Sequence, residues 1–173
     1  LSAPLPPAVR AAAREWAAGA ALVRAEERAA GRQPRGGAEP SAPRLVEQEV
    51  VVCAEAKKGP KLRRHLASVD AEDQAEGRTR GAGTRVLVFA RTGAAAAALA
   101  SELAAEGRRA AAVHGDMPQP DRLRALADFK AGKVRVLVAT DVAGRGLHVA
   151  GLTRVVNYDA PPTAEAYAHR VGR

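Results

Sequence analysis

From Leu45 onward, short apolar runs rich in β-branched residues alternate with segments of helical periodicity. Two of these runs, residues 86–89 and 134–138, have the composition of strands that are buried on both faces of a parallel sheet. Gly107 and Gly132 stand where helices should end. The alternation predicts strands over residues 45–53, 85–90, 110–113, 134–139 and 153–158, and helices over residues 58–69, 94–106, 119–131 and 163–170. The sequence therefore predicts an open α/β sheet with helices on both faces and ligands at the carboxyl ends of its strands.

Three other segments do not follow this alternation. Residues 8–29 have the periodicity of one helix, preceded by two prolines. Residues 31–43 are rich in glycine and proline and predict a flexible linker. Residues 70–83 are polar and glycine-bearing, and we expect them to form a mobile surface loop.

The composition limits the classes of protein and partner. Twenty-seven basic residues against 19 acidic ones give a net charge of +8, spread along the chain, which favours a polyanionic partner. Cys53 is the only cysteine, so an internal disulfide and a cysteine zinc site are excluded, and we expect a buried, inert thiol. No apolar stretch is long enough to cross a bilayer, so no membrane partner is expected. Glu15, Glu26 and Glu27 argue against an organellar targeting peptide, and the start at Leu1 indicates a piece of a longer intracellular protein.

Two segments carry groups suited to phosphate chemistry. Residues 138–149 begin as a buried strand and continue into a turn that holds a hydroxyl, a carboxylate, glycines and an arginine. Residues 169–173, His-Arg-Val-Gly-Arg, offer two guanidiniums and an imidazole. A guanidinium stays charged and directs paired donors at phosphate oxygens, so it suits a group that neutralises charge on a transferred phosphoryl. Together the segments indicate nucleotide-driven work on RNA.

The order of motifs over residues 45–173 resembles the second, C-terminal RecA-like domain of the DEAD-box RNA helicases. Residues 86–92 resemble motif IV, residues 114–122 the following Gln-x-x-Arg motif, residues 138–149 motif V and residues 169–173 the start of motif VI. The resemblance implies a RecA-like three-layer α/β domain with an open, mainly parallel sheet that is truncated at its C-terminus and preceded by a helix and a linker.

The front of the chain extends this resemblance. Residues 1–10 resemble motif III and the helix after it, with Pro4 where the family has threonine. The implied division is the end of a first RecA-like domain over residues 1–30, a linker over residues 31–43, and the second domain over residues 44–173, incomplete after the start of motif VI.

For RNA, the resemblance implies contacts from strand ends and from the helix of the Gln-x-x-Arg motif. Such groups contact the sugar-phosphate backbone without reading bases. Taken from the residues alone, Thr92 also suits a helix N-cap and Arg122 a surface salt bridge. With two Phe, two Tyr and one Trp, base stacking is disfavoured. The implied RNA-binding residues are Thr92, Gln119, Arg122 and Thr140.

For ATP, the resemblance makes Arg173 an arginine finger on the γ-phosphate, a role worth roughly a thousandfold or more in rate. It places Arg170 beside Arg173 as a structural neighbour in the catalytic set and His169 as a bridge to the first domain. The remaining nucleotide-site residues are implied to be Asp141, Arg145, Gly146 and His148, together with Arg173.

His148 departs from the family pattern, which has an aspartate that accepts hydrogen bonds from the ribose. A neutral imidazole accepts only one such bond, so we expect nucleotide binding to be weaker by about 1 to 3 kcal/mol.

The chain holds no Gly-x-x-x-x-Gly-Lys-Ser/Thr loop and no Asp-Glu-Ala-Asp run, so a first RecA-like domain outside it would hold most of ATP and Mg²⁺. We expect no metal ligands and no ATP hydrolysis from this chain alone. The predicted function is that of an ATP-dependent RNA helicase that remodels or unwinds RNA and works with that first domain. A DNA helicase of the same superfamily and a non-catalytic RNA- or protein-binding scaffold stay open as alternatives. A dinucleotide-binding domain is disfavoured, because it would require a Gly-x-Gly-x-x-Gly after the first strand and none follows it.

Overall fold

The computed structural model describes residues 24–25, 48–78, 83–144 and 152–171, and the chain divides after Lys57 into two units. In the first unit, β1 (Arg24–Ala25) pairs antiparallel with β2 (Gln48–Glu49), and the 3-10 helix η1 (Glu55–Lys57) follows. The helix predicted for residues 8–29 is therefore wrong at residues 24–25, because a partner distant in sequence pairs with them. The rest of that segment and the predicted linker lie outside the described residues.

The strand predicted for residues 45–53 is also wrong over most of its length. Only Gln48 and Glu49 form a strand, and residues 50–54 have no regular structure. Val51 and Val52 are exposed, so the apolar run does not pack as a buried strand. Cys53 is only partly buried, which corrects the expectation of a buried thiol.

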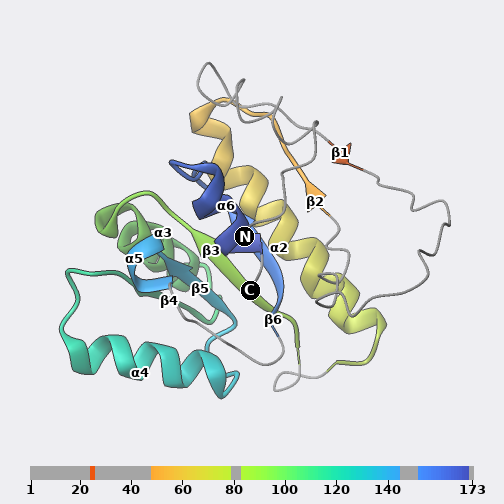
Figure 1. The fold of residues 1–173 in the computed structure, drawn as a ribbon. Helices are drawn as coiled ribbons and strands as arrows, with labels where there is room; N and C mark the ends of the chain where they lie inside the picture. The colour runs from red at the N-terminus through yellow and green to blue at the C-terminus, as the bar shows by residue number, and fades with distance from the viewer. Residues whose placement is uncertain (1–23, 26–47, 79–82, 145–151, 172–173) are drawn as a thin grey trace, which may run out of the picture. The chain divides into compact units, whose positions relative to one another are not determined.

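The second unit confirms the predicted parallel sheet. Its four strands lie in the order β4-β5-β3-β6 and all pair in parallel (Figure 1). Its elements are α2 (Lys58–Ala75), β3 (Arg85–Phe89), α3 (Gly93–Ala105), β4 (Ala110–Val113), α4 (Gln119–Lys130), β5 (Val136–Ala139), α5 (Asp141–Gly144), β6 (Leu152–Asn157) and α6 (Ala164–Val171). None of the helices in the described residues is both long enough and apolar enough to span a bilayer.

The alternation of side chains along β3 and β5 produces a core on each face of the sheet. Val86 and Val88 pack with buried residues of α2 and α3 on one face. Leu87 and Phe89 pack with α4, including the fully buried Phe129, on the other. Figure 1 shows α2 and α4 on opposite sides of the sheet. The sheet is therefore packed on both faces, and the chain leaves its strands at a common carboxyl edge.

Gly107 and Gly132 end helices as predicted. Gly107 has φ of +82° and follows the C-cap residue of α3, and Gly132 has φ of +74° and follows the C-cap residue of α4. These left-handed conformations suit glycine, which has no Cβ to clash. Each glycine therefore turns the chain from a helix into the next strand.

Residues 70–75 are helical, so the loop predicted for residues 70–83 is wrong at its start. Asp73, which is 2% exposed, accepts hydrogen bonds from the Thr84 amide (2.8 Å), the Thr84 hydroxyl (2.7 Å) and Arg78 Nε (2.9 Å), and from Arg135. Thr84 and Arg135 lie at the amino edge of the sheet and Arg78 follows α2, so these donors hold the end of the helix in place. The polar composition of this segment suggested a loop. The sequence alone does not show the donors that allow the Asp73 carboxylate to be buried at the end of a helix. Residues 79–82 lie outside the described residues.

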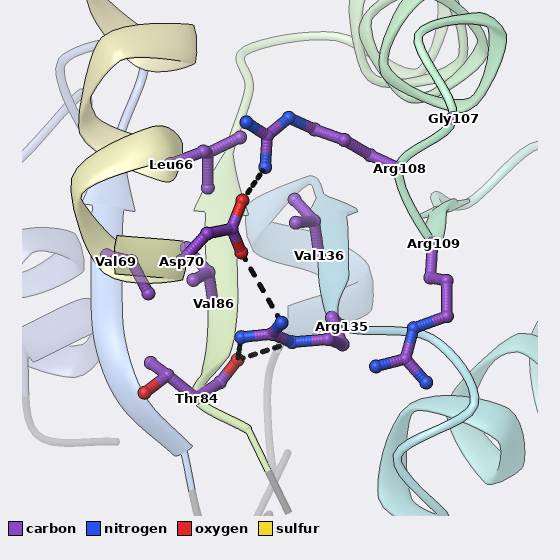
Figure 2. A pocket seen from close by; sticks show the side chains of 10 residues that line it. All are labelled: Leu66, Val69, Asp70, Thr84, Val86, Gly107, Arg108, Arg109, Arg135 and Val136. Atoms are coloured by element: carbon purple, nitrogen blue, oxygen red, sulfur yellow. Dashed lines mark hydrogen bonds and ion pairs between the residues drawn. The ribbon is translucent and has the colours of Figure 1, made fainter. Parts of the chain in front are cut away.

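The same cluster borders a cavity of about 340 Å³ at the amino edge of the sheet. Figure 2 shows Asp70 between Arg108 and Arg135, with Arg109 on the far rim. Arg108 Nη1 donates to Asp70 at 2.7 Å, and Arg135 donates to Asp73 and to the Thr84 carbonyl. Arg109 donates to the Gly132 carbonyl at 3.0 Å, and the bonds of Arg108 and Arg135 to Asp70 and Asp73 join α2 to the sheet.

Candidate functional site at the carboxyl edge of the sheet

The register of the strands brings two predicted site residues, Thr92 and Thr140, to one edge. Val113 pairs with Ala139, Ala139 with Phe89, and Phe89 with Asn157, so the four strands end level with one another. The residues that follow these strand ends include His114, Thr140, Thr92 and Asp159. The carboxyl edge therefore carries a row of polar groups.

Thr92 lies on this edge as the N-cap of α3. Its hydroxyl accepts a hydrogen bond from the Ala95 amide at 3.1 Å, and its backbone is extended, with φ of −125° and ψ of 157°. This confirms the N-cap that the residues predicted. Thr92 is also exposed, so the start of α3, where amide groups and the helix dipole favour anions, is open to solvent.

The other predicted RNA contacts lie on two different elements. Thr140 follows β5 directly, is 8% exposed, and donates its amide to the Val113 carbonyl at 3.3 Å. Gln119 is the first residue of α4 and is exposed. Arg122 donates to the side chain of Gln119 one turn earlier, so its partner is an amide rather than the carboxylate of a salt bridge. Thr92 and Thr140 follow adjacent strands, and the Gln119–Arg122 pair lies on the helix after β4.

Arg170 is the most buried charged side chain of the edge, at 1% exposed. Its Nε and Nη2 donate to the two oxygens of Asp141 at 2.6 and 2.7 Å, in a paired geometry. Its Nη1 donates to Asn157 Oδ1 at 2.9 Å and to the Asp159 carbonyl at 2.8 Å. Its guanidinium also lies 4.7 Å from the ring centre of Phe89. Arg170 thus holds together the ends of β3, β5 and β6, a role within the sheet that the sequence analysis did not predict.

Asp159 is the second centre of this network. Its carboxylate accepts from Lys58 Nζ at 2.7 Å and from the Arg91 amide at 2.8 Å, and its own amide donates to the Phe89 carbonyl at 3.1 Å. Burial alone would raise the pKa of the Asp159 carboxyl, but hydrogen bonds from Lys58 and the Arg91 amide lower it below its ordinary value. The group is therefore a carboxylate at neutral pH.

The remaining predicted nucleotide residues are only partly described. His169 is exposed on α6, one residue before the buried Arg170. Asp141 is the first residue of α5, and its carboxylate accepts hydrogen bonds from Arg170. In the part of the chain that the structure describes, no group of three or more His, Cys, Asp or Glu side chains could hold a metal ion. The candidates Arg145, Gly146, His148 and Arg173 lie outside the described residues.

Sequence reasoning missed the roles of Lys58, Asn157 and Asp159. The sequence analysis assigned no role to Asp159, although it follows β6 by two residues. A carboxylate directly after a parallel strand is a usable signal, since such positions share the carboxyl edge with the ligand. Lys58 has no comparable signal, because it lies 101 residues from Asp159 in sequence.

Comparisons with known proteins agree on the family. Residues 75–173 match the family model described as the helicase conserved C-terminal domain. The ATP-dependent RNA helicase DBP2 of Meyerozyma guilliermondii is 40% identical over 138 residues, which cover 80% of this chain and 23% of that protein. The DEAD-box ATP-dependent RNA helicase CshA of Streptococcus pneumoniae is 52% identical over 87 residues, covering 50% of this chain and 17% of that protein. The chain thus spans about a quarter or less of the length of these curated relatives.

Solved structures give the same result for the fold. A structure of E. coli SrmB, a DEAD-box protein bound to regulator of ribonuclease activity A, has a TM-score of 0.56 and 32% identity, covering 69% of this chain and 64% of that one. A structure of S. cerevisiae Dbp5 bound to RNA and ADP BeF3 has a TM-score of 0.54 and 30% identity, covering 69% of this chain and 29% of that one. The fold predicted from the strand and helix alternation is thus the RecA-like one, and the chain belongs to the DEAD-box RNA helicases, whose conserved C-terminal domain it carries at residues 75–173.

Proposed function

We propose that this chain is the second lobe of an ATP-dependent RNA helicase and supplies half of its RNA track and part of its nucleotide cleft. The observation that carries this proposal is the row of polar groups at the level carboxyl ends of the four parallel strands. Its relatives are named as ATP-dependent RNA helicases, and one similar structure holds RNA and ADP BeF3.

The proposed RNA track runs over Thr92, Thr140 and the Gln119–Arg122 pair. The start of α3 is suited to a phosphate because its first amides point out of the helix and the helix dipole favours a negative charge there. Arg122 adds a guanidinium whose donors match phosphate oxygens. All of these groups contact the backbone and none reads a base edge, so we expect binding with little sequence preference.

The proposed nucleotide contacts come from α6 and from the motif V turn. His169 is exposed next to Arg170, whose four hydrogen bonds fix the helix that carries both. We propose that Arg173, Arg145, Gly146 and His148 complete this side, and that a first RecA-like lobe holds most of ATP and Mg²⁺. When bound, ATP with Mg²⁺ supplies the phosphoryl group whose hydrolysis drives opening of the two lobes.

The RNA track is tested by two substitutions that both keep the cap of α3. Aspartate and asparagine are good N-cap residues, so Thr92→Asp and Thr92→Asn should both melt close to the parent. Only aspartate places a negative charge against the proposed phosphate. We expect Thr92→Asp to weaken binding of a labelled single-stranded oligouridylate about tenfold or more in fluorescence anisotropy, and Thr92→Asn to change it less than threefold. Equal affinities of the two variants would contradict the proposed track.

The nucleotide side is tested in the full-length protein. We expect His148→Asp to tighten ATP binding, because a carboxylate accepts ribose hydrogen bonds that a neutral imidazole cannot. We expect Arg173→Lys to remove most RNA-stimulated hydrolysis, since an ammonium lacks the paired donors of a guanidinium. A full-length protein that binds RNA and never hydrolyses ATP would favour the scaffold alternative.

A further inference from the structure

We propose that Lys58 and Asp159 are positioning residues for the RNA track: together they tie the first turn of α2 to the turn that presents Thr92. This inference rests on the proposed function, because it assigns the pair a role in RNA binding. The two residues are separated by 101 positions in sequence and belong to the same unit.

The geometry of Asp159 shows how one side chain can serve two elements. One carboxylate oxygen accepts from Lys58 Nζ at 2.7 Å, and the other accepts from the Arg91 amide at 2.8 Å. The side chains of Lys58 and Asp159 are 15% and 10% exposed, so water competes little for either bond. A carboxylate in this setting fixes the backbone of Arg91 relative to the start of α2.

The amide that Asp159 holds lies one residue before Thr92. The position of the Arg91 peptide decides where the Thr92 hydroxyl and the first amides of α3 point. The Asp159 carbonyl also accepts from Arg170, which in turn holds Asp141, the neighbour of Thr140. Asp159 is therefore bonded directly to the backbone amide beside Thr92 and, through Arg170, to the side chain of the residue beside Thr140.

Lys58 links Asp159 to α2. It is the first residue of α2 and of the second unit, and its ammonium also lies 5.6 Å from the ring centre of Tyr158. A shift of the first turn of α2 would pull on Asp159 and hence on the Arg91 turn. The pair thus couples the first turn of α2 to the turn that presents Thr92.

The Asp159→Asn substitution tests the inference because simple electrostatics and the positioning role predict opposite changes in RNA affinity. Asp159→Asn removes a negative charge, and simple electrostatics predicts tighter RNA binding. An amide has one acceptor oxygen and cannot serve both Lys58 and the Arg91 amide. We expect weaker binding instead, about fivefold, a typical size for coupling between linked sites. The probe is the labelled oligouridylate, bound to the 173-residue chain at fixed salt.

A matched pair of lysines gives the second measurement. Lys58→Met and Lys61→Met remove the same charge from the same turn of α2, and Lys61 is exposed. We expect about a fivefold loss for Lys58→Met and less than a twofold loss for Lys61→Met. Hydrogen exchange of the Arg91 amide should accelerate in Lys58→Met and Asp159→Asn but stay unchanged in Lys61→Met.

The outcomes separate this inference from the function on which it rests. A parent chain that does not bind the oligouridylate refutes the proposed function itself. If the parent binds and the folded Asp159→Asn variant binds equally or more tightly, the positioning role is overturned and the RNA track stands. If Asp159→Asn fails to fold, the lysine pair decides, and equal affinities of Lys58→Met and Lys61→Met overturn the inference.

Discussion

Replacing Arg170 by lysine keeps the positive charge of the buried network but removes the planar guanidinium that directs hydrogen bonds to three residues. The guanidinium makes four hydrogen bonds: two to Asp141, one to Asn157 and one to the Asp159 carbonyl. An ammonium presents its donors from a single atom and cannot reach acceptors on three sides. We therefore expect Arg170→Lys to lose at least two charge-assisted bonds.

The cost follows from the burial of the partners. Each lost bond to a charged group is worth about 1.5 to 3 kcal/mol. The Asp141 side chain is 31% exposed and the bond to Asn157 is part-buried, so water replaces part of those losses, while the bond to the Asp159 carbonyl is buried. We expect the free energy of unfolding to fall by about 2 to 4 kcal/mol in Arg170→Lys. For a unit of this size that corresponds to a decrease of about 8 to 16 °C in Tm.

Urea unfolding followed by circular dichroism measures this loss. The exposed Arg124 on α4 supplies the control, since Arg124→Lys should change the free energy of unfolding by less than about 0.5 kcal/mol. The m-value should stay unchanged, because the variant alters the native network and not the surface exposed on unfolding. If Arg170→Lys is as stable as Arg124→Lys, the fork geometry contributes nothing and the reasoning fails.

Two further predictions concern other polar positions. Burial alone would raise the pKa of the Asp73 carboxyl, but hydrogen bonds from Thr84 outweigh burial and lower the pKa in the folded state. The ionised Asp73 therefore stabilises the fold above its ordinary pKa near 3.8, and this stabilisation is lost as pH falls through the folded-state pKa. Urea titrations should therefore show Asp73→Asn less stable than the parent at pH 7, with the difference shrinking below about pH 4; a gap constant with pH would contradict this. At Gly93, an added Cβ would lie 2.7 Å from Asp116 Oδ2 and 2.8 Å from His114 Nδ1. We expect Gly93→Ala to shift these side chains and lower the free energy of unfolding by about 1 to 3 kcal/mol, and an unchanged melting temperature would show that the turn adapts freely.

The parts of the fold that the sequence predicted are those decided by local pattern. β4 was placed at residues 110–113 and α4 at residues 119–131, against observed bounds of Ala110–Val113 and Gln119–Lys130. Apolar periodicity, helix-ending glycines and the Thr92 cap are all read from a few neighbouring residues. Segments with these signals were assigned correctly to within a few residues.

The parts that failed are decided by partners far along the chain. β1 exists because Arg24 pairs with Glu49, and the end of α2 is held by donors from Thr84 and Arg135. Local composition carries no information on such pairings, since the same polar residues would be stable in a solvated loop. The sequence also predicted the residues of the candidate site more readily than their bonds, because the Asp159 carboxylate joins elements that no spacing rule connects.

The same residue types serve opposite purposes at the two edges of this sheet. At the amino edge, Asp73 and Arg135 bind each other, and their bonds only hold α2 on the sheet. At the carboxyl edge, the buried Arg170 donates hydrogen bonds to Asp141, while the side chain of Thr92 is exposed to solvent. A buried ion pair adds little net stability compared with apolar residues of the same size, so its value lies in fixing geometry. The carboxyl edge therefore uses buried charge to fix the backbone beside the exposed Thr92, which is the rigidity that the proposed RNA track requires.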